Sequence, residues 1–135
     1  MIICNNNKMI GYISPCQIGK RHDYRFLKEE FPPTQDWFKH FNIQVDLSYL
    51  GIAKDYICPN IIIPPKRKKK MALTAQQKRE NHFISSKRVV VEHTIAGLKR
   101  YRILSERLRM HLLDLYNDIL GVCAGLWNFY LADFS

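Results

Sequence analysis

Two acidic residues stand where they could bind a divalent metal ion. Asp46 closes the segment Ile43–Asp46, which alternates like a strand, and ligands of open α/β sheets gather at the carboxyl ends of strands. Glu92 lies in a basic segment, with Arg88 four residues before it and Lys99 seven after it; on a helix the three fall within about 40° of one another. Carboxylate oxygens suit Mg²⁺ or Mn²⁺. Asp46 and Glu92 could therefore hold metal ions that activate a water in phosphodiester cleavage.

Both acids also have a simpler interpretation. Asp46 could cap the loop that follows it, a common role for aspartate in turns. Arg88 and Glu92 could form only a solvated ion pair, worth about 0.3–0.5 kcal/mol. The spacing alone favours this second interpretation, and two carboxylates are few for a two-metal site, which usually has a third acid between the ions.

Positive charge is concentrated in the middle of the chain. The 135 residues have a formal net charge of +9, and residues 61–110 hold fourteen of the 21 Lys and Arg but three of the 12 Asp and Glu. Such a segment favours a polyanionic partner, DNA or RNA before an anionic membrane. The same segment contains a basic run that we expect to form an exposed loop, which could contact the phosphates of a nucleic acid. A nuclear import signal and a solvated charge run are the alternatives. The run consists of Lys66, Arg67, Lys68, Lys69 and Lys70.

The elements that must position these residues alternate between strands and helices. We predict one α/β or α+β domain with a mixed sheet. Its predicted elements are a hairpin over residues 1–14 that turns at Asn5-Asn6-Asn7, a helix at His22–Glu30 with Asp23 in its first turn, a helical turn at Trp37–Phe41, strands at Ile43–Asp46 and Asn60–Ile63, a helix from Thr74 to about Tyr101 with a break near Ser85 as an option, and a helix at Met110–Ala132.

Apolar side chains suggest which helix faces are buried. On the long helix, five residues fall mostly on one face that we expect to pack on the rest of the domain. These are Phe83, Ile84, Val91, Leu98 and Tyr101. On the last helix, Trp127, Phe129 and Tyr130 are interpreted as core residues rather than as residues that stack on nucleobases.

Other classes of site have little support. The four cysteines are scattered, without the short spacing of a zinc site or a redox motif, and we see no secretory signal, so we expect a reducing compartment. The most apolar segment, Ile119–Phe134, contains Asn128 and Asp133 and is too short to span a bilayer. We therefore expect no membrane partner.

Five blocks of sequence carry a resemblance to a known family. They read SPCQIGKRHDYRFLKE, VDLSYLGI, IIIPPKRKKK, LTAQQKRENHFISSKRVVVEHTIAGLKRYRILSERLR and LGVCAGLWNFYL. In this order they resemble the C-terminal part of the catalytic domain of DDE transposases, both the bacterial insertion-sequence type and the related Harbinger-type endonucleases. The most specific part is the R-x3-E-x6-K arrangement of Arg88, Glu92 and Lys99.

The resemblance implies an RNase H-like fold, a mixed sheet flanked by helices. It makes Asp46 and Glu92 the second and third acids of the catalytic triad and the ligands of Mg²⁺ or Mn²⁺. Arg88 and Lys99, with the adjoining Arg100, are then expected to contact DNA phosphates near the scissile bond. The implied reaction is metal-dependent cleavage and joining of DNA strands at transposon ends.

The chain also departs from the family pattern. The first acid of the triad normally precedes a hairpin like that of residues 1–14, and Asp23 matches the family's helix-starting aspartate instead. Ser85 stands where the family often has Tyr, and Ser48 replaces a loop glycine. We therefore expect a catalytic domain truncated at its N-terminus with the first strand missing, its sheet part at about residues 1–65, its basic loop at 66–70 and its helical part at about 74–132.

These expectations lead to several functional hypotheses. The chain alone is expected to be inactive, with the first acid supplied by a second chain or reading frame. The alternative is a non-enzymatic DNA-binding remnant, or a competitor of intact transposase; a pseudogene product without function is a third option. An exposed sheet edge would favour a homodimer. We expect a cytoplasmic, nucleoid-associated protein in a bacterium, or a nuclear one in a eukaryote.

Overall fold

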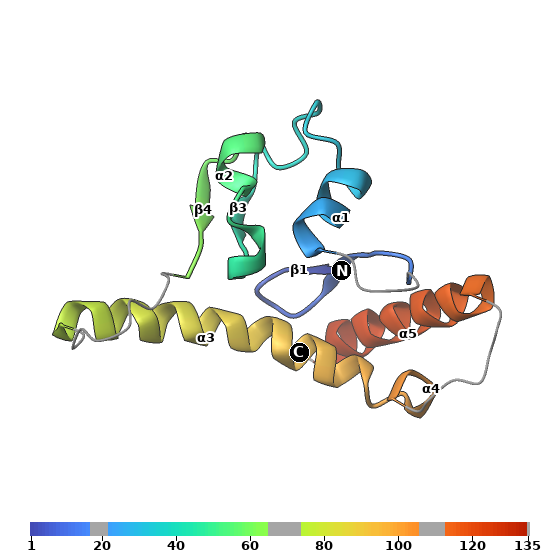
Figure 1. The fold of residues 1–135 in the computed structure, drawn as a ribbon. Coiled ribbons are helices and arrows are strands. Elements are labelled where there is room, and N and C mark those ends of the chain that lie inside the picture. Colours follow the sequence, from blue (N-terminus) through green and yellow to red (C-terminus); the bar gives the residue numbers. More distant parts are fainter. Residues whose placement is uncertain (17–21, 65–73, 106–112, 135) are drawn as a thin grey trace. The chain divides into compact units, whose positions relative to one another are not determined.

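The computed structural model describes residues 1–16, 22–64, 74–105 and 113–134 (Figure 1). The chain forms two compact units. The terminal unit comprises Met1–Ile18 and Ser86–Ser135, and the central unit comprises Gly19–Ser85. Helix α3 (Ala75–Leu98) is continuous, and the boundary between the units falls inside it, between Ser85 and Ser86. The predicted mixture of strands and helices is confirmed.

The terminal unit begins with the predicted β-hairpin. Strand β1 (Ile2–Cys4) pairs antiparallel with β2 (Ile10–Ile13), with a bulge between Ile3 and Cys4. The Asn5 side-chain oxygen accepts hydrogen bonds from the backbone N–H groups of Asn7 at 2.9 Å and Met9 at 3.0 Å. The asparagine therefore closes the turn by replacing backbone partners, as the Asn-rich sequence predicts.

Helix α5 (Leu113–Phe134) holds this hairpin through its asparagine side chains. The Asn128 side chain accepts from the Ile10 N–H at 2.7 Å and donates to the Ile10 carbonyl at 2.8 Å. Asn117 accepts from the Cys16 N–H at 2.8 Å. Polar groups of the β2 strand and the segment after it are thus paired by the helix rather than by another strand.

The core of the terminal unit combines the hairpin, α5 and the last turns of α3. Its buried residues are Ile10, Leu98, Cys123, Ala124 and Trp127. The short helix α4 (Arg102–Ser105), which was not predicted, follows α3 and has no buried residue. Burial of Trp127 removes one of the largest apolar surfaces of the unit from water, which makes this residue central to its stability.

The buried face of α3 differs from the predicted one. Leu98 is buried as predicted, but Phe83 is 54% exposed and Val91 is 40% exposed. Thr94, which is fully buried, and the buried Gly97 were not part of the predicted face. The Thr94 hydroxyl donates to the Val90 carbonyl at 2.9 Å. A Cβ at Gly97 would lie 2.4 Å from the Trp127 ring. Close approach of a large ring requires small residues on this face, so the prediction based on large apolar residues was wrong for Phe83 and Val91.

The central unit contains α1 (Asp23–Glu30), β3 (Asn42–Gln44), the 3₁₀ turn η1 (Leu47–Tyr49), α2 (Ile52–Asp55) and β4 (Asn60–Ile62). Strands β3 and β4 are parallel, with Ile43 opposite Ile61. An aromatic cluster packs beside α1, where Phe31 contacts Trp37 and Phe38, and Phe38 contacts Tyr56. The Tyr56 hydroxyl donates to the Phe31 carbonyl at 2.6 Å, which satisfies the polar end of a buried ring.

The predicted elements are largely found, with several differences. The described strands form two separate two-stranded sheets, one antiparallel and one parallel, instead of one mixed sheet. Residues 37–40 form hydrogen-bonded turns rather than helix, and η1 and α2 occupy a segment for which no helix was predicted. Helix α3 ends at Leu98 and has no break at Ser85.

Candidate metal and nucleic-acid sites

Asp46 lies two residues beyond the end of β3, at the N-cap of η1. Its side chain accepts a hydrogen bond from the Leu47 N–H at 2.8 Å, and its carbonyl accepts from the Tyr49 N–H at 3.0 Å. The capping role considered from the sequence is therefore present, and it fixes the backbone that carries the acid. The side chain is exposed, so capping leaves the carboxylate accessible from solvent.

The charges of Asp23 and Asp46 both act on the phenol of Tyr49. Burial, followed by the charges of Asp23 and Asp46, raises the pKa of Tyr49 to about 12. The phenol thus stays protonated at neutral pH beside two carboxylates. Sequence reasoning assigned Tyr49 no role, although it belongs to the VDLSYLGI block; its only local signal is its position three residues after Asp46.

Helix α1 anchors the loop that carries Asp46. The Tyr24 ring meets the Tyr49 ring edge-on, with centroids 6.5 Å apart, and occupies the space that a side chain at Gly51 would need. The Tyr24 hydroxyl and the Lys28 ammonium both bind Asp55. The hydrogen bond from Lys28, followed by the one from Tyr24, lowers the pKa of Asp55, so its carboxylate stays charged and keeps both partners.

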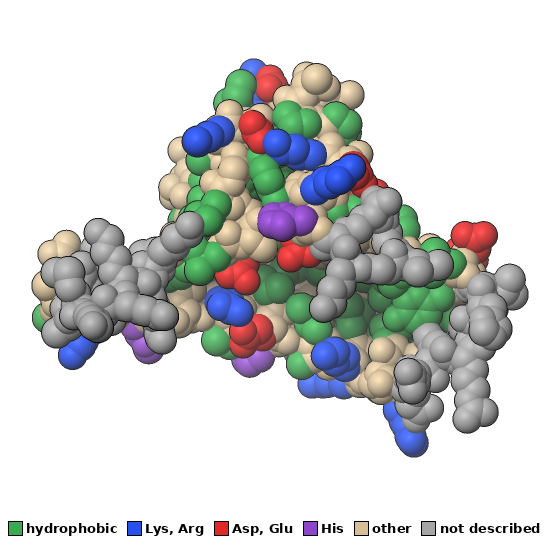
Figure 2. All heavy atoms as spheres, viewed as in Figure 1, with side chains coloured by type: hydrophobic (Ala, Val, Ile, Leu, Met, Phe, Trp, Pro, Cys, Tyr) green, Lys and Arg blue, Asp and Glu red, His purple; other side chains and the backbone are tan. Residues whose placement is uncertain are grey.

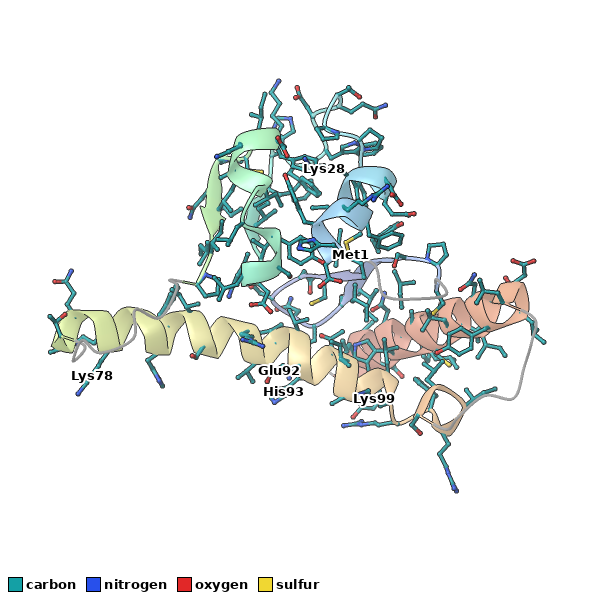
Figure 3. The ribbon with its side chains drawn as sticks, viewed as in Figure 1. Met1, Lys28, Lys78, Glu92, His93 and Lys99 are labelled. Atoms are coloured by element: carbon teal, nitrogen blue, oxygen red, sulfur yellow. The ribbon has the colours of Figure 1, made fainter. Side chains whose placement is uncertain are left out.

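Glu92 lies on α3 in the terminal unit and pairs with Arg88. The Arg88 Nε lies 3.3 Å from Glu92 Oε1, and both side chains are more than half exposed. Since Glu92 precedes the buried Thr94 by two residues, it points about 200° around the helix from it, on the side away from the hairpin. Figure 3 shows Glu92, His93 and Lys99 along this part of α3. The predicted ion pair is therefore present and solvated.

The predicted DNA-contacting residues have different surroundings. Lys99 is exposed at the end of α3, where its N–H donates to the Ile95 carbonyl at 3.0 Å. Arg100 is also exposed, with its guanidinium carbon 5.7 Å from the centre of the Trp127 ring and 5.9 Å from that of Tyr130. The predicted basic loop, Lys66, Arg67, Lys68, Lys69 and Lys70, lies outside the described residues.

The two candidate metal ligands belong to different units. Asp46 is in the central unit and Glu92 in the terminal unit, so the structure describes the surroundings of each acid separately. Within the described ranges, no three His, Cys, Asp or Glu residues gather as a metal site would require. The exposed carboxylates nevertheless provide the oxygen donors that Mg²⁺ prefers. Across the same ranges, no helix has both the length and the apolar character needed to cross a membrane.

The comparisons with known proteins concern nearly the whole chain. The chain is 31% identical over 116 residues to a probable transposase for the insertion sequence element IS702 of Microchaete diplosiphon. The similarity covers 84% of this chain and 39% of the relative, so the chain spans about two fifths of that protein's length. No solved structure matches closely enough to count as similar. Residues 1–128 match the DDE superfamily endonuclease family, and the chain belongs to that family.

Proposed function

We propose that this chain is part of a DNA transposase in which Asp46 and Glu92 are two of the metal-binding acids. The observation that carries the proposal is the family match over residues 1–128, which includes both acids. The local surroundings support it, because each carboxylate is exposed and held on a defined element: Asp46 on the loop after β3, and Glu92 on α3.

The proposed cofactor is Mg²⁺ or Mn²⁺. A divalent ion held by carboxylates would supply charge stabilisation and an acidified water for phosphodiester cleavage. The contribution of the chain itself is to hold the acids: Leu47 fixes the orientation of Asp46 through its N–H, and Tyr49 keeps a neutral phenol beside it. Glu92 can exchange Arg88 for a metal ion at little cost, because an exposed ion pair is weak.

The proposed substrate is DNA, bound through its phosphates. Arg88, Lys99 and Arg100 are exposed cations on or just after α3, and the run at residues 66–70 would add further phosphate contacts. Contacts of this kind give affinity that is independent of sequence and falls steeply with salt. Strand cleavage and joining at transposon ends, as in an insertion sequence, remain part of the proposal.

We further propose that these 135 residues do not cleave DNA alone. The proposed triad needs a third acid in an RNase H-like sheet, and that acid would come from outside these residues. A non-enzymatic DNA-binding protein is the alternative, and it would bind DNA without any dependence on Asp46 or Glu92.

Metal titration tests the role of the acids. We expect Asp46→Asn and Glu92→Gln each to weaken binding of Mn²⁺, measured by calorimetry, by about tenfold or more, since each removes one charged ligand. Asp36→Asn is the matched control, because Asp36 is an exposed carboxylate that pairs with Lys39. Equal affinity in all four proteins would overturn the metal-site proposal and favour the DNA-binding alternative.

A second experiment distinguishes the effect of Arg88 on metal binding from its effect on DNA binding. Arg88→Gln removes a cation beside Glu92, so we expect Mn²⁺ to bind about twofold more tightly and the salt slope of DNA binding to fall by about 0.9. Arg25→Gln is the control, since Arg25 forms an i,i+4 pair of the same kind with Glu29 at 3.4 Å. Nicking of supercoiled DNA by the isolated chain, abolished by Glu92→Gln, would show that the chain is active alone.

A further inference from the structure

The terminal unit holds a rigid aromatic ring next to its exposed cations. The indole N–H of Trp127 donates to the Lys8 carbonyl at 2.9 Å, and its ring lies against Gly97. Lys8 has a φ of 67°, a left-handed conformation that non-glycine residues rarely adopt. The Thr94 hydroxyl oxygen, whose shorter hydrogen bond goes to Val90, lies 3.4 Å from the same Lys8 carbonyl. The hairpin turn and α3 thus fix Trp127, which is only 5% exposed.

Tyr130 extends this buried ring to the surface. Its ring stacks on that of Trp127, with centroids 6.0 Å apart and an angle of 27° between the planes. In contrast to Trp127, Tyr130 is 43% exposed. Phe129, the next residue back, is 68% exposed, so the sequence-based assignment of Phe129 and Tyr130 to the core was wrong. Hydrophobic side chains are visible on the surface over α5 in Figure 2.

Arg100 adds a positive charge to these rings. Its guanidinium lies 5.7 and 5.9 Å from the ring centres of Trp127 and Tyr130. These distances are near the outer limit of about 6 Å for a cation–π contact, so the guanidinium is not closely seated on either ring. Lys99 and Arg102 are exposed within two residues of it, which makes the sequence around Arg100 strongly cationic.

We propose that Tyr130 and Arg100 form a stacking platform for an unpaired nucleobase of a DNA strand, with Trp127 as its rigid support. The proposal rests on the proposed DNA-processing function and adds a preference for DNA in which a base is not paired. A base within a duplex has both faces covered by its neighbours, so only an unpaired base can offer a face to Tyr130.

The charges around the platform favour a nucleic acid over an acidic peptide. Arg100 lies beside the rings and could meet a phosphate next to a stacked base, and Lys99 and Arg102 are exposed within two residues of it in the sequence. A nucleic acid always offers flat rings together with negative charge, whereas an acidic peptide need not contain an aromatic ring. Asp133, one turn after Tyr130, is the exposed acid nearest to it in the sequence of α5.

The test compares two short single-stranded probes at low ionic strength by fluorescence anisotropy. One is oligothymidylate, and the other has the same length but lacks bases at its central positions. We expect the unmodified protein to bind the abasic probe about tenfold more weakly, as loss of a stacked base predicts. Tyr130→Ala should weaken oligothymidylate binding about tenfold and leave abasic binding unchanged. Tyr130→Phe should retain binding, and Phe129→Ala is the matched control for loss of an exposed ring.

A measurement on the intact platform covers the case in which Tyr130→Ala fails to fold. In a Trp37→Phe background, Trp127 is the only tryptophan, and oligothymidylate should quench its fluorescence more than the abasic probe does. Equal quenching, equal binding of both probes, or equal losses from Tyr130→Ala and Phe129→Ala would overturn the platform. If duplex DNA still bound with a steep salt dependence, the proposed DNA function would stand; if neither DNA form bound, both proposals would fail.

Discussion

Replacing Asn128 by Ala should destabilise the terminal unit more than replacing Asn117 by Ala does. The side chain makes two hydrogen bonds with one residue, to the Ile10 N–H and carbonyl at 2.7 and 2.8 Å. Ile10 is only 8% exposed, so water replaces these partners poorly. Each buried group left unsatisfied costs about 1–3 kcal/mol, and Ala returns about 0.5 kcal/mol through its higher helix propensity. We expect a net loss of about 1.5–5.5 kcal/mol in the free energy of unfolding.

The assay is urea unfolding followed by Trp127 fluorescence in a Trp37→Phe background, so that the signal reports the unit that contains α5. Asn117→Ala is the matched control: it removes one hydrogen bond, to the Cys16 N–H, and should cost about 1 kcal/mol. The midpoint should fall while the m-value stays constant. A loss below about 1 kcal/mol for Asn128→Ala, or one no larger than that of Asn117→Ala, would refute the reasoning.

Three further predictions concern packing and ionisation. Gly97→Ala places a Cβ 2.4 Å from the Trp127 ring and should lower stability by a net amount of about 1–2 kcal/mol in thermal unfolding, because overpacking outweighs helix propensity; Gly125→Ala meets no atom within 4 Å and should instead raise it by up to about 1 kcal/mol. The folded chain holds the Tyr49 proton more tightly than the unfolded chain, so stability should fall as pH rises from 10 to about 12, and Tyr49→Phe should flatten this limb when unfolding is followed across pH. The pKa of Asp55 is lowered from 3.8, so its contribution to stability is present at neutral pH and is lost as the pH falls below that value. The urea midpoint of Asp55→Asn should therefore change less than that of the parent protein as the pH is lowered through this range.

The sequence predicted the elements well where local signals define them. The Asn5 turn, the helix that begins at Asp23 and the apolar last helix each depend on residues within a few positions of one another, and all three are found. The strands at residues 42–44 and 60–62 also agree to within one or two residues. Turn residues, helix-ending residues and apolar runs act on their immediate neighbours in the chain, so a single sequence is enough to predict the elements that they define.

The packing of α3 could not be predicted in the same way. Helical periodicity selects large apolar residues as the buried face, but the face that packs is chosen by Thr94 and Gly97. Gly97 lies against Trp127, thirty residues later in the sequence, and Thr94 lies near the Lys8 carbonyl, which also accepts from Trp127. The exposure of Tyr130 beside the buried Trp127 follows from the same contact. Pattern reasoning identifies apolar residues, whereas only the three-dimensional partner decides which of them can be covered.

The two candidate acids also differ in how firmly their own surroundings hold them. Asp46 is tied by its side chain to the Leu47 N–H and by its carbonyl to the Tyr49 N–H, so a cation would find it already oriented. Glu92 has a longer side chain and one surface partner, Arg88, and such a pair is worth at most about 0.5 kcal/mol. Ordering the Glu92 side chain costs a comparable or larger amount of conformational entropy, up to about 2 kcal/mol. Binding of a metal ion would therefore cost more conformational entropy at Glu92 than at Asp46.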